Sequence, residues 1–246
     1  MTDIQPHIVA IVQARMASTR LPGKVLCDLA GKPMLVRVVE RLQHSQLIDS
    51  ILVATTLEES DSPIVGLCSQ QGYASYRGSL NDVLDRFYQA ARLTGADVIV
   101  RITADCPVLD PGLVDETIRS FLGQDSAPAD IDFAANRLPP PFHRTYPIGL
   151  DAEVCSFAAL ERAWQEADQP YHREHVMPFL YEGIQPLAHL MKKNSPGYWD
   201  LFLSQRGFRI LLLNYDYLSR KYLSVKGCVM EGATLTEVAP KKETVA

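Results

Sequence analysis

The stretch that decides the fold reads Gln13-Ala14-Arg15-Met16-Ala17-Ser18-Thr19-Arg20-Leu21-Pro22-Gly23-Lys24. It directly follows an apolar run, Ile8 to Val12, which is typical of a buried β-strand. Open α/β sheets bind their ligands at the carboxyl ends of their strands. The sequence therefore predicts an α/β fold with a ligand-binding loop directly after its first strand.

This loop concentrates the groups that bind phosphate. Its cations are Arg15, Arg20 and Lys24, and its hydroxyl donors are Ser18 and Thr19. An arginine can fork onto phosphate oxygens, whereas a lysine is a point charge that can follow charge onto a leaving group. Backbone N–H groups in such a loop add further donors. The loop is therefore predicted to hold a polyphosphate, and a solvated basic loop is the alternative.

The loop matches neither of two common phosphate-binding motifs. A Walker A motif requires Gly-x-x-x-x-Gly-Lys-Ser/Thr, but here Gly23-Lys24 is followed by Val25. The Gly-x-Gly-x-x-Gly fingerprint of dinucleotide-binding folds is also absent from the loop.

The composition excludes several classes of protein. The 246 residues carry a formal charge of −5, unlike general nucleic-acid binders, and 47% are hydrophobic, enough for a full core. Five cysteines without a Cys-x-x-Cys pair predict reduced thiols rather than disulfides or a zinc site. Met1 to Pro6 shows no signal-peptide pattern, and no apolar run reaches the roughly 20 residues that span a bilayer. We therefore expect a cytoplasmic protein without a membrane or nucleic-acid partner.

Strand-like and helix-like segments alternate along the first half of the chain. The predicted strands are 8–12, 51–54, 74–76, 98–102 and 148–154. The predicted helices are 33–44, 62–71, 80–91, one that starts at Asp110-Pro111, and 157–167 with Ser156 as its cap. This order predicts a mainly parallel sheet with helices on both faces, which is a three-layer α/β architecture.

The loop resembles the signature loop of the sugar-acid cytidylyltransferases, on Arg15 followed by Ser18 to Lys24. CMP-KDO synthetase carries nearly the same run, and the chain is most similar to the spore-coat polysaccharide biosynthesis protein F group. Further matching stretches are 76–79 with 82–86, 101–107, 147–154 and 173–176. The resemblance implies a nucleotide-diphospho-sugar transferase fold of Rossmann-like type. It also implies a nucleotidyltransferase domain over 1–204, followed by a divergent and partly disordered segment, 205–246.

A metal site is expected where the fourth predicted strand ends. Asp105 directly follows that strand, and Mg²⁺ needs only one or two protein carboxylates beside substrate phosphates. The resemblance makes Asp105 the metal-binding aspartate; a turn cap before Pro107 is the alternative. In the family a later aspartate commonly completes this site, but Arg206 stands at about its position here.

Two acids of a later predicted strand share one face, because Asp151 and Glu153 are two positions apart. They are expected to bind sugar hydroxyls, and Asp151 is also expected to be a second metal ligand; an exposed strand face is the alternative. Arg173 completes the predicted sugar site, through the charge of an acidic sugar.

The predicted nucleotide site extends beyond the loop. Its residues are Ala14, Arg15, Ser18, Thr19, Arg20, Gly23, Lys24, Arg77, Asp82, Arg101 and Thr103. Asp82 is also a candidate helix cap, or one half of an i,i+4 surface pair with Arg86. Arg101 lies within a predicted strand, so a buried ion pair is the alternative to nucleotide binding.

The resemblance implies an Mg²⁺-dependent enzyme that joins CTP and an acidic or related sugar, releasing pyrophosphate. Its expected catalytic residues are Arg15, Lys24 and Asp105. The enzyme is expected to act in surface polysaccharide synthesis and to form a homodimer. Two alternatives stay open. One is a glycosyltransferase on the same fold, although no Asp-x-Asp motif follows the fourth predicted strand. The other is a nucleotide-binding homologue impaired by Arg206.

Overall fold

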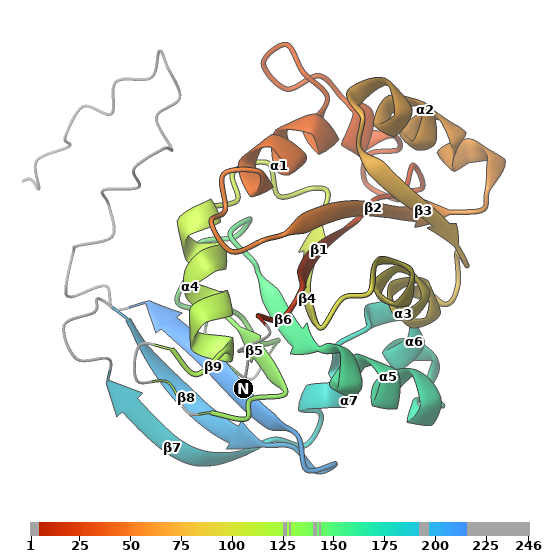
Figure 1. Ribbon diagram of the computed structural model, residues 1–246. Helices are drawn as coiled ribbons and strands as arrows, with labels where there is room; N and C mark the ends of the chain where they lie inside the picture. The colour runs from red at the N-terminus through yellow and green to blue at the C-terminus, as the bar shows by residue number, and fades with distance from the viewer. Residues whose placement is uncertain are drawn as a thin grey trace, which may run out of the picture.

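The computed structural model describes residues 5–124, 127, 129–139, 142, 144–191 and 197–215 of the 246. In this part of the chain the strands form one nine-stranded sheet, in the order β3-β2-β1-β4-β6-β5-β9-β8-β7 (Figure 1). The pairs among β3, β2, β1 and β4 are parallel, whereas β6 runs antiparallel to both of its neighbours. The predicted α/β class is confirmed, and the sheet is parallel in its first half and mixed in its second.

The strands are β1 (Ile8–Gln13), β2 (Ser50–Thr56), β3 (Ala74–Gly78), β4 (Val98–Thr103), β5 (Phe133–Ala135), β6 (Glu153–Ser156), β7 (Gln185–Met191), β8 (Gly197–Leu203) and β9 (Arg209–Tyr215). The α-helices are α1 (Met34–Leu42), α2 (Ser62–Gln71), α3 (Val83–Thr94), α4 (Pro111–Phe121), α5 (Phe157–Glu166), α6 (Pro170–His175) and α7 (Pro178–Tyr181). Two short 3-10 helices are η1 (Lys24–Leu26) and η2 (Glu59–Asp61).

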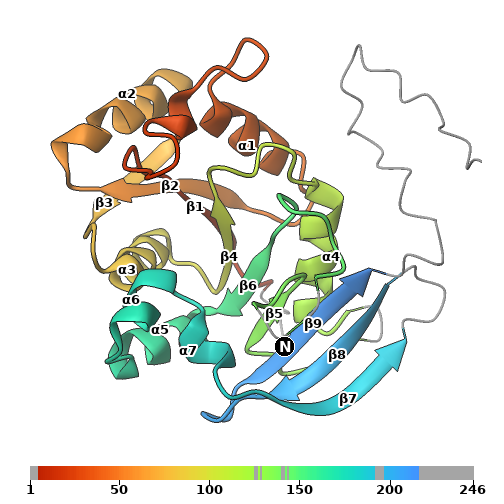
Figure 2. The same ribbon diagram turned by 180° about the vertical axis from the view of Figure 1, so that it is seen from behind.

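Two hydrophobic cores lie on opposite faces of the sheet. One core takes its helical residues from α1, α2 and α4, and the other takes them from α3, α5 and α7. Figures 1 and 2 show α3, α5, α6 and α7 grouped on one side of the parallel strands, with α1 and α2 on the other. Alternate residues of β1 enter the two cores, so this strand is apolar throughout, as strands buried on both faces are.

Local helix signals are confirmed at two predicted caps. The side chain of Asp110 accepts hydrogen bonds from the backbone N–H groups of Gly112 at 2.8 Å and Leu113 at 3.2 Å, at the start of α4. Ser156 accepts from the N–H of Ala159 at 3.1 Å, at the start of α5. Each oxygen satisfies donors that have no partner within the helix.

The predicted strand over 148–154 is wrong in its bounds. The strand in this region is β6, which begins only at Glu153 and ends at Ser156. Gly149 has a φ of 94° and Ile148 is 82% exposed, so the chain turns here at the surface. An apolar side chain in a turn imitates one position of a strand pattern, and the sequence periodicity does not distinguish the two.

The sheet continues beyond residue 204, where the nucleotidyltransferase domain was expected to end. β9 pairs with β8 and also with β5, deep in the second half of the sheet. The expected divergent segment therefore begins in the turn between two paired strands. Its part from residue 216 onward, including the expected disorder, lies outside the described residues. Within the part of the chain that the structure describes, no helix is both long and apolar enough to cross a membrane.

Replacing the cap of α4 should destabilise the fold measurably. We expect Asp110→Ala to lower the free energy of unfolding by about 1 kcal/mol, because two N–H groups of α4 lose their acceptor. Urea unfolding followed by circular dichroism measures this loss. The matched control is Asp168→Ala, at an exposed position outside any helix. An equal loss of stability in both variants would contradict the capping role.

Candidate functional site

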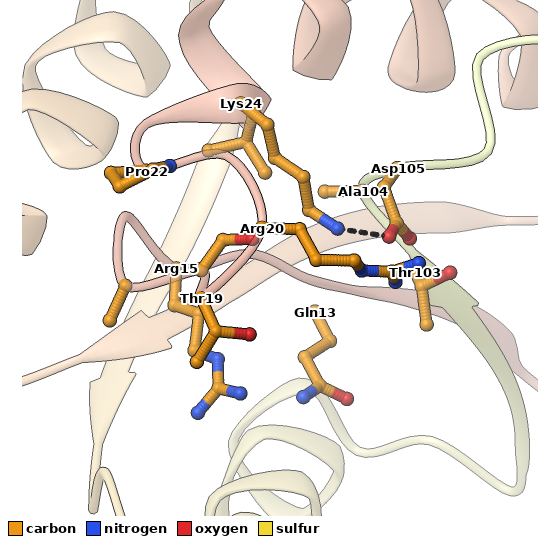
Figure 3. A pocket seen from close by; sticks show the side chains of 12 residues that line it. Gln13, Arg15, Thr19, Arg20, Pro22, Lys24, Thr103, Ala104 and Asp105 are labelled. Atoms are coloured by element: carbon orange, nitrogen blue, oxygen red, sulfur yellow. Dashed lines mark hydrogen bonds and ion pairs between the residues drawn. The ribbon is translucent and has the colours of Figure 1, made fainter.

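A cavity of about 570 Å³ lies at the carboxyl ends of β1 and β4 (Figure 3). One wall is the loop between β1 and η1, and the other is the end of β4 with the residues that follow it. We call this space the loop cavity. Its lining residues are Gln13, Arg15, Ala17, Ser18, Thr19, Arg20, Pro22, Lys24, Val25, Thr103, Ala104 and Asp105.

Backbone hydrogen bonds give the loop its shape. The N–H of Ala14 donates to the carbonyl of Ala54 at 3.0 Å, and the N–H of Gly23 donates to the carbonyl of Met16 at 2.8 Å. Gly23 has a φ of 72°, and an added Cβ would lie 3.3 Å from the Met16 side chain, so glycine is required to close this turn. Ala14 and Gly23 therefore shape the loop without lining the loop cavity.

Asp61 also holds the loop, a role that sequence reasoning missed. Its buried carboxylate accepts the N–H of Met16 at 2.7 Å and the hydroxyl of Thr56. This contact fastens the loop to the end of β2 and the start of α2. The sequence signal at Asp61 was interpreted as a helix start, and nothing local indicates a partner 45 positions away.

Two arginines of the loop are available to a ligand. Arg15 and Arg20 are exposed and extend from the loop in Figure 3. Among the described residues, neither guanidinium has an acidic partner or a hydrogen-bonded one. In Figure 3 Arg20 reaches toward Thr103 and Asp105, whereas Arg15 points away from them. Two unpaired guanidinium groups in one cavity with the hydroxyls of Ser18 and Thr19 form the donor set expected for a polyphosphate.

Lys24 and Asp105 meet directly across the loop cavity. The Nζ of Lys24 donates to the carboxylate of Asp105, and Figure 3 shows the two side chains pointing toward each other. Burial disfavours the charged form of Asp105, but the hydrogen bonds from Lys24 and Thr103 outweigh burial and lower the pKa of this carboxyl below its ordinary value. Asp105 is therefore a carboxylate at neutral pH.

Gln13 is a further lining residue that sequence reasoning missed. It is the last residue of β1, and its Oε1 accepts a hydrogen bond of 3.4 Å from Nη2 of Arg101. Its place at the junction of strand and loop is the signal that identifies it. Thr103, at the end of β4, was predicted and lines the loop cavity.

Arg77 lies outside the loop cavity. Its Nε and Nη2 donate to the carbonyls of Thr56 and Glu58, both at 2.8 Å, so Arg77 fastens the end of β2.

Asp82 and Arg173 form an ion pair with each other. The guanidinium forks onto the carboxylate at 3.0 and 2.6 Å, while Asp82 also caps α3 by accepting the N–H of Asp85. The pair joins α3 to α6, so a predicted nucleotide contact and a predicted sugar contact satisfy each other.

Arg86 is not half of a surface pair with Asp82. It is fully buried, and one of its nitrogens donates to the carbonyl of Ser79. Burial and the nearby charge of Arg15 lower the pKa of Arg86 to about 10. The spacing of four positions between Asp82 and Arg86 suggested a surface pair. It could not show that the Arg86 side chain points to the loop after β3.

The predicted acids of the later strand are paired with arginines. Glu153 binds Arg101, which also lies 5.8 Å from the ring of Phe87. Asp151 binds Arg144 at 3.0 Å and Arg137 at 3.6 Å. Arg101 therefore forms an ion pair, which was the alternative to nucleotide binding at this position. Neither Asp151 nor Glu153 lines the loop cavity.

Arg206 is held in the turn between β8 and β9. It lies 2.7 Å from a carboxylate oxygen of Glu182 and 4.1 Å from the ring centre of Phe179. Glu182 neutralises its charge, and Arg206 is not among the residues that line the loop cavity.

Asp105 is the one carboxylate among the lining residues of the loop cavity. In the described ranges no group of three or more histidines, cysteines and acids stands close enough to hold a metal ion. One carboxylate fits a Mg²⁺ ion that arrives with phosphate and water ligands, because this ion rarely uses a cage made of protein alone. The donor set is therefore compatible with a nucleotide-bound cation.

Acid should remove the stabilisation that the Lys24–Asp105 contact supplies. The folded-state pKa of Asp105 is depressed below 3.8, so its contribution is present above that pH and is lost as the pH falls through the folded-state value. We expect the difference in urea midpoint between the wild type and Asp105→Asn to shrink as the pH falls from neutral to about 3. A difference that grows toward acid pH would contradict this assignment.

Comparison with known proteins agrees with this geometry. A family model described as cytidylyltransferase matches residues 9–210. Spore coat polysaccharide biosynthesis protein SpsF of Bacillus subtilis is 35% identical over 204 residues, covering 78% of this chain and 79% of that protein. The 3-deoxy-manno-octulosonate cytidylyltransferase of Trichlorobacter lovleyi is 40% identical over 119 residues, 48% of this chain and 46% of that protein. A solved cytidylyltransferase from Leptospira borgpetersenii has a TM-score of 0.65 and 34% identity, covering 72% of this chain and 71% of that one.

Proposed function

The chain belongs to the cytidylyltransferase family, and from that premise we propose that it joins CTP to a sugar, giving a CMP-sugar and pyrophosphate. The observation that carries the proposal is the loop cavity. Two unpaired arginines, three hydroxyls and a lysine surround a space next to a single carboxylate. This donor set suits a triphosphate bound together with a cation.

The reaction is a nucleotidyl transfer, in which the CMP group of CTP is transferred by substitution at its α-phosphorus. A sugar hydroxyl oxygen forms a bond to this phosphorus while the bond to the bridging oxygen of pyrophosphate breaks. The electron pair leaves with pyrophosphate, and the hydroxyl proton passes to solvent. Transfers of this kind depend mainly on positioning and on charge stabilisation.

The loop residues have distinct roles in this proposal. Arg15 and Arg20 would fork onto phosphate oxygens, and Ser18 and Thr19 would donate to them. Lys24 would offset the charge that develops on pyrophosphate as it leaves. The backbone of the loop is already held by hydrogen bonds at Ala14, Met16 and Gly23, so these side chains extend from a preformed scaffold.

Asp105 is the residue that would hold a divalent cation, whose charge would stabilise the phosphate oxygens. In the free protein Lys24 occupies this carboxylate. A bound triphosphate offers Lys24 a more negative partner, which would release Asp105. We therefore propose that the nucleotide and Mg²⁺ bind together rather than one independently of the other.

The competing functions differ in what they release. A glycosyltransferase would release a nucleoside diphosphate or monophosphate, whereas the proposed enzyme releases pyrophosphate. An impaired homologue would bind CTP without turnover. The impaired homologue was considered because Arg206 would repel a cation. Arg206 is paired with Glu182 and lines no part of the loop cavity, which favours the active enzyme.

A role in surface polysaccharide synthesis rests on the name of the Bacillus subtilis relative. A cytoplasmic location and a homodimer stay predictions of the same proposal.

Removing the loop lysine should slow turnover strongly. We expect Lys24→Ala to lower kcat by roughly 10²–10³, as the loss of one preorganised charge contact does. Pyrophosphate release from CTP in the presence of sugar acids is the measurement. Lys32→Ala is the matched control, because Lys32 pairs with Glu40 outside the loop cavity. A Lys24→Ala protein with near-normal turnover would refute the assigned role.

A further inference from the structure

A second cavity lies beside the loop cavity. It has a volume of about 490 Å³, and its walls come from β4, β6, the segment after β5, α6 and α7. Figure 2 shows α7 beside the end of β6. Its lining residues are Arg101, Arg137, Pro139, Glu153, Tyr171, His175, Pro178, Tyr181 and Glu182.

The two cavities adjoin along β4. Arg101 lines the second cavity and donates to Gln13, which lines the loop cavity. Thr103 is two positions further along β4 on the same face, about 7 Å away, and lines the loop cavity. A ligand in the second cavity would therefore lie next to phosphates in the loop cavity.

The walls of the second cavity combine aromatic rings with charged groups, as sites for polar ring-shaped ligands do. Tyr171 and Tyr181 supply the rings. Glu153 is neutralised by Arg101. Glu182 accepts a hydrogen bond from the hydroxyl of Tyr171, and its other carboxylate oxygen lies 2.7 Å from Nη1 of Arg206, so this acid also has its partners.

Arg137 differs from the other charged groups of the second cavity. Its side chain is 46% exposed, and its nitrogen lies 3.6 Å from Asp151, a loose ion pair. Asp151 is bound more closely by Arg144, at 3.0 Å. Exposed pairs of this kind add little to stability. Arg137 can therefore turn to another anion without leaving Asp151 unpaired.

Arg173 does not have this freedom. Besides its fork onto Asp82, it donates from Nη1 to the carbonyl of Trp164 at 2.7 Å. A ligand that recruited Arg173 would break the link between α3 and α6. The sequence predicted that Arg173 binds the charge of an acidic sugar. Arg137 is better placed for this role.

We infer that the second cavity is the acceptor site and that Arg137 binds the carboxylate of a sugar acid there, an inference that rests on the proposed function. Tyr171 and Tyr181 pack against the sugar ring, and the paired carboxylate of Glu153 accepts hydroxyl groups. The attacking hydroxyl then faces the loop cavity, across the Gln13–Arg101 contact. Arg137 thus determines the selectivity for acidic over neutral sugars.

The test compares Arg137→Gln and Arg137→Lys with the wild type in assays of CTP-dependent pyrophosphate release. The acidic acceptors are 3-deoxy-manno-octulosonate, N-acetylneuraminate and glucuronate, and the neutral acceptor is glucose. We expect an acidic sugar to be used, and Arg137→Gln to raise its KM by roughly 10–100-fold, the value of a charge-assisted hydrogen bond. The kcat and the KM for CTP should not change, and Arg137→Lys should be intermediate. Arg92→Gln, at an exposed position of α3, is the matched control.

Three results would overturn the inference. They are a preference for glucose over the acids, an unchanged KM for the acid in Arg137→Gln, and no turnover of any acid by a protein that binds CTP. The last result leaves the nucleotide half of the proposed function standing. Failure to bind CTP at all would instead overturn the proposed function itself.

Discussion

The contact between Lys24 and Asp105 is the interaction on which the site depends. The two residues are 81 positions apart in the chain and meet because β1 and β4 are parallel neighbours whose carboxyl ends lie together. The turn at Gly23 presents Lys24 to the cavity, and the contact overcomes the cost of partly burying Asp105. Without a ligand the lysine and the carboxylate satisfy each other. In the proposed reaction a triphosphate would replace Asp105 as the partner of Lys24, and its cation would replace Lys24 as the partner of Asp105.

The same arrangement extends across the face of the sheet that carries α3, α5, α6 and α7. Asp105, Glu153, Asp151 and Glu182 each have a cationic partner. The attraction within each pair partly offsets the cost of removing its charges from water. Among the residues that line the two cavities, the guanidinium groups without a close acidic partner are those of Arg15 and Arg20 in the loop, and that of Arg137, whose pair with Asp151 is loose. Those are the positions where an anion would gain most. The spatial separation of paired and unpaired charge therefore indicates where phosphate and carboxylate groups would bind.

Features that depend on neighbouring residues could be predicted from the sequence. The buried strand β1, the caps at Asp110 and Ser156, and the cationic loop are all encoded within a few positions. Features that depend on distant partners could not. The fork of Arg173 onto Asp82 joins residues 91 positions apart, and the turn at Gly149 imitates a strand in its apolar pattern. Gln13, Asp61 and Arg137 were missed for the same reason, since each acquires its role only from contacts that the fold creates.

The most direct test of the central claim is a calorimetric titration of the whole chain with CTP, with and without Mg²⁺. The exchange of partners at Lys24 and Asp105 predicts that CTP binds more tightly with Mg²⁺, and in preference to ATP, GTP and UTP. It also predicts that Asp105→Asn abolishes the effect of Mg²⁺ while CTP still binds. Absent CTP binding, or binding indifferent to Mg²⁺ in the wild type, would contradict the account.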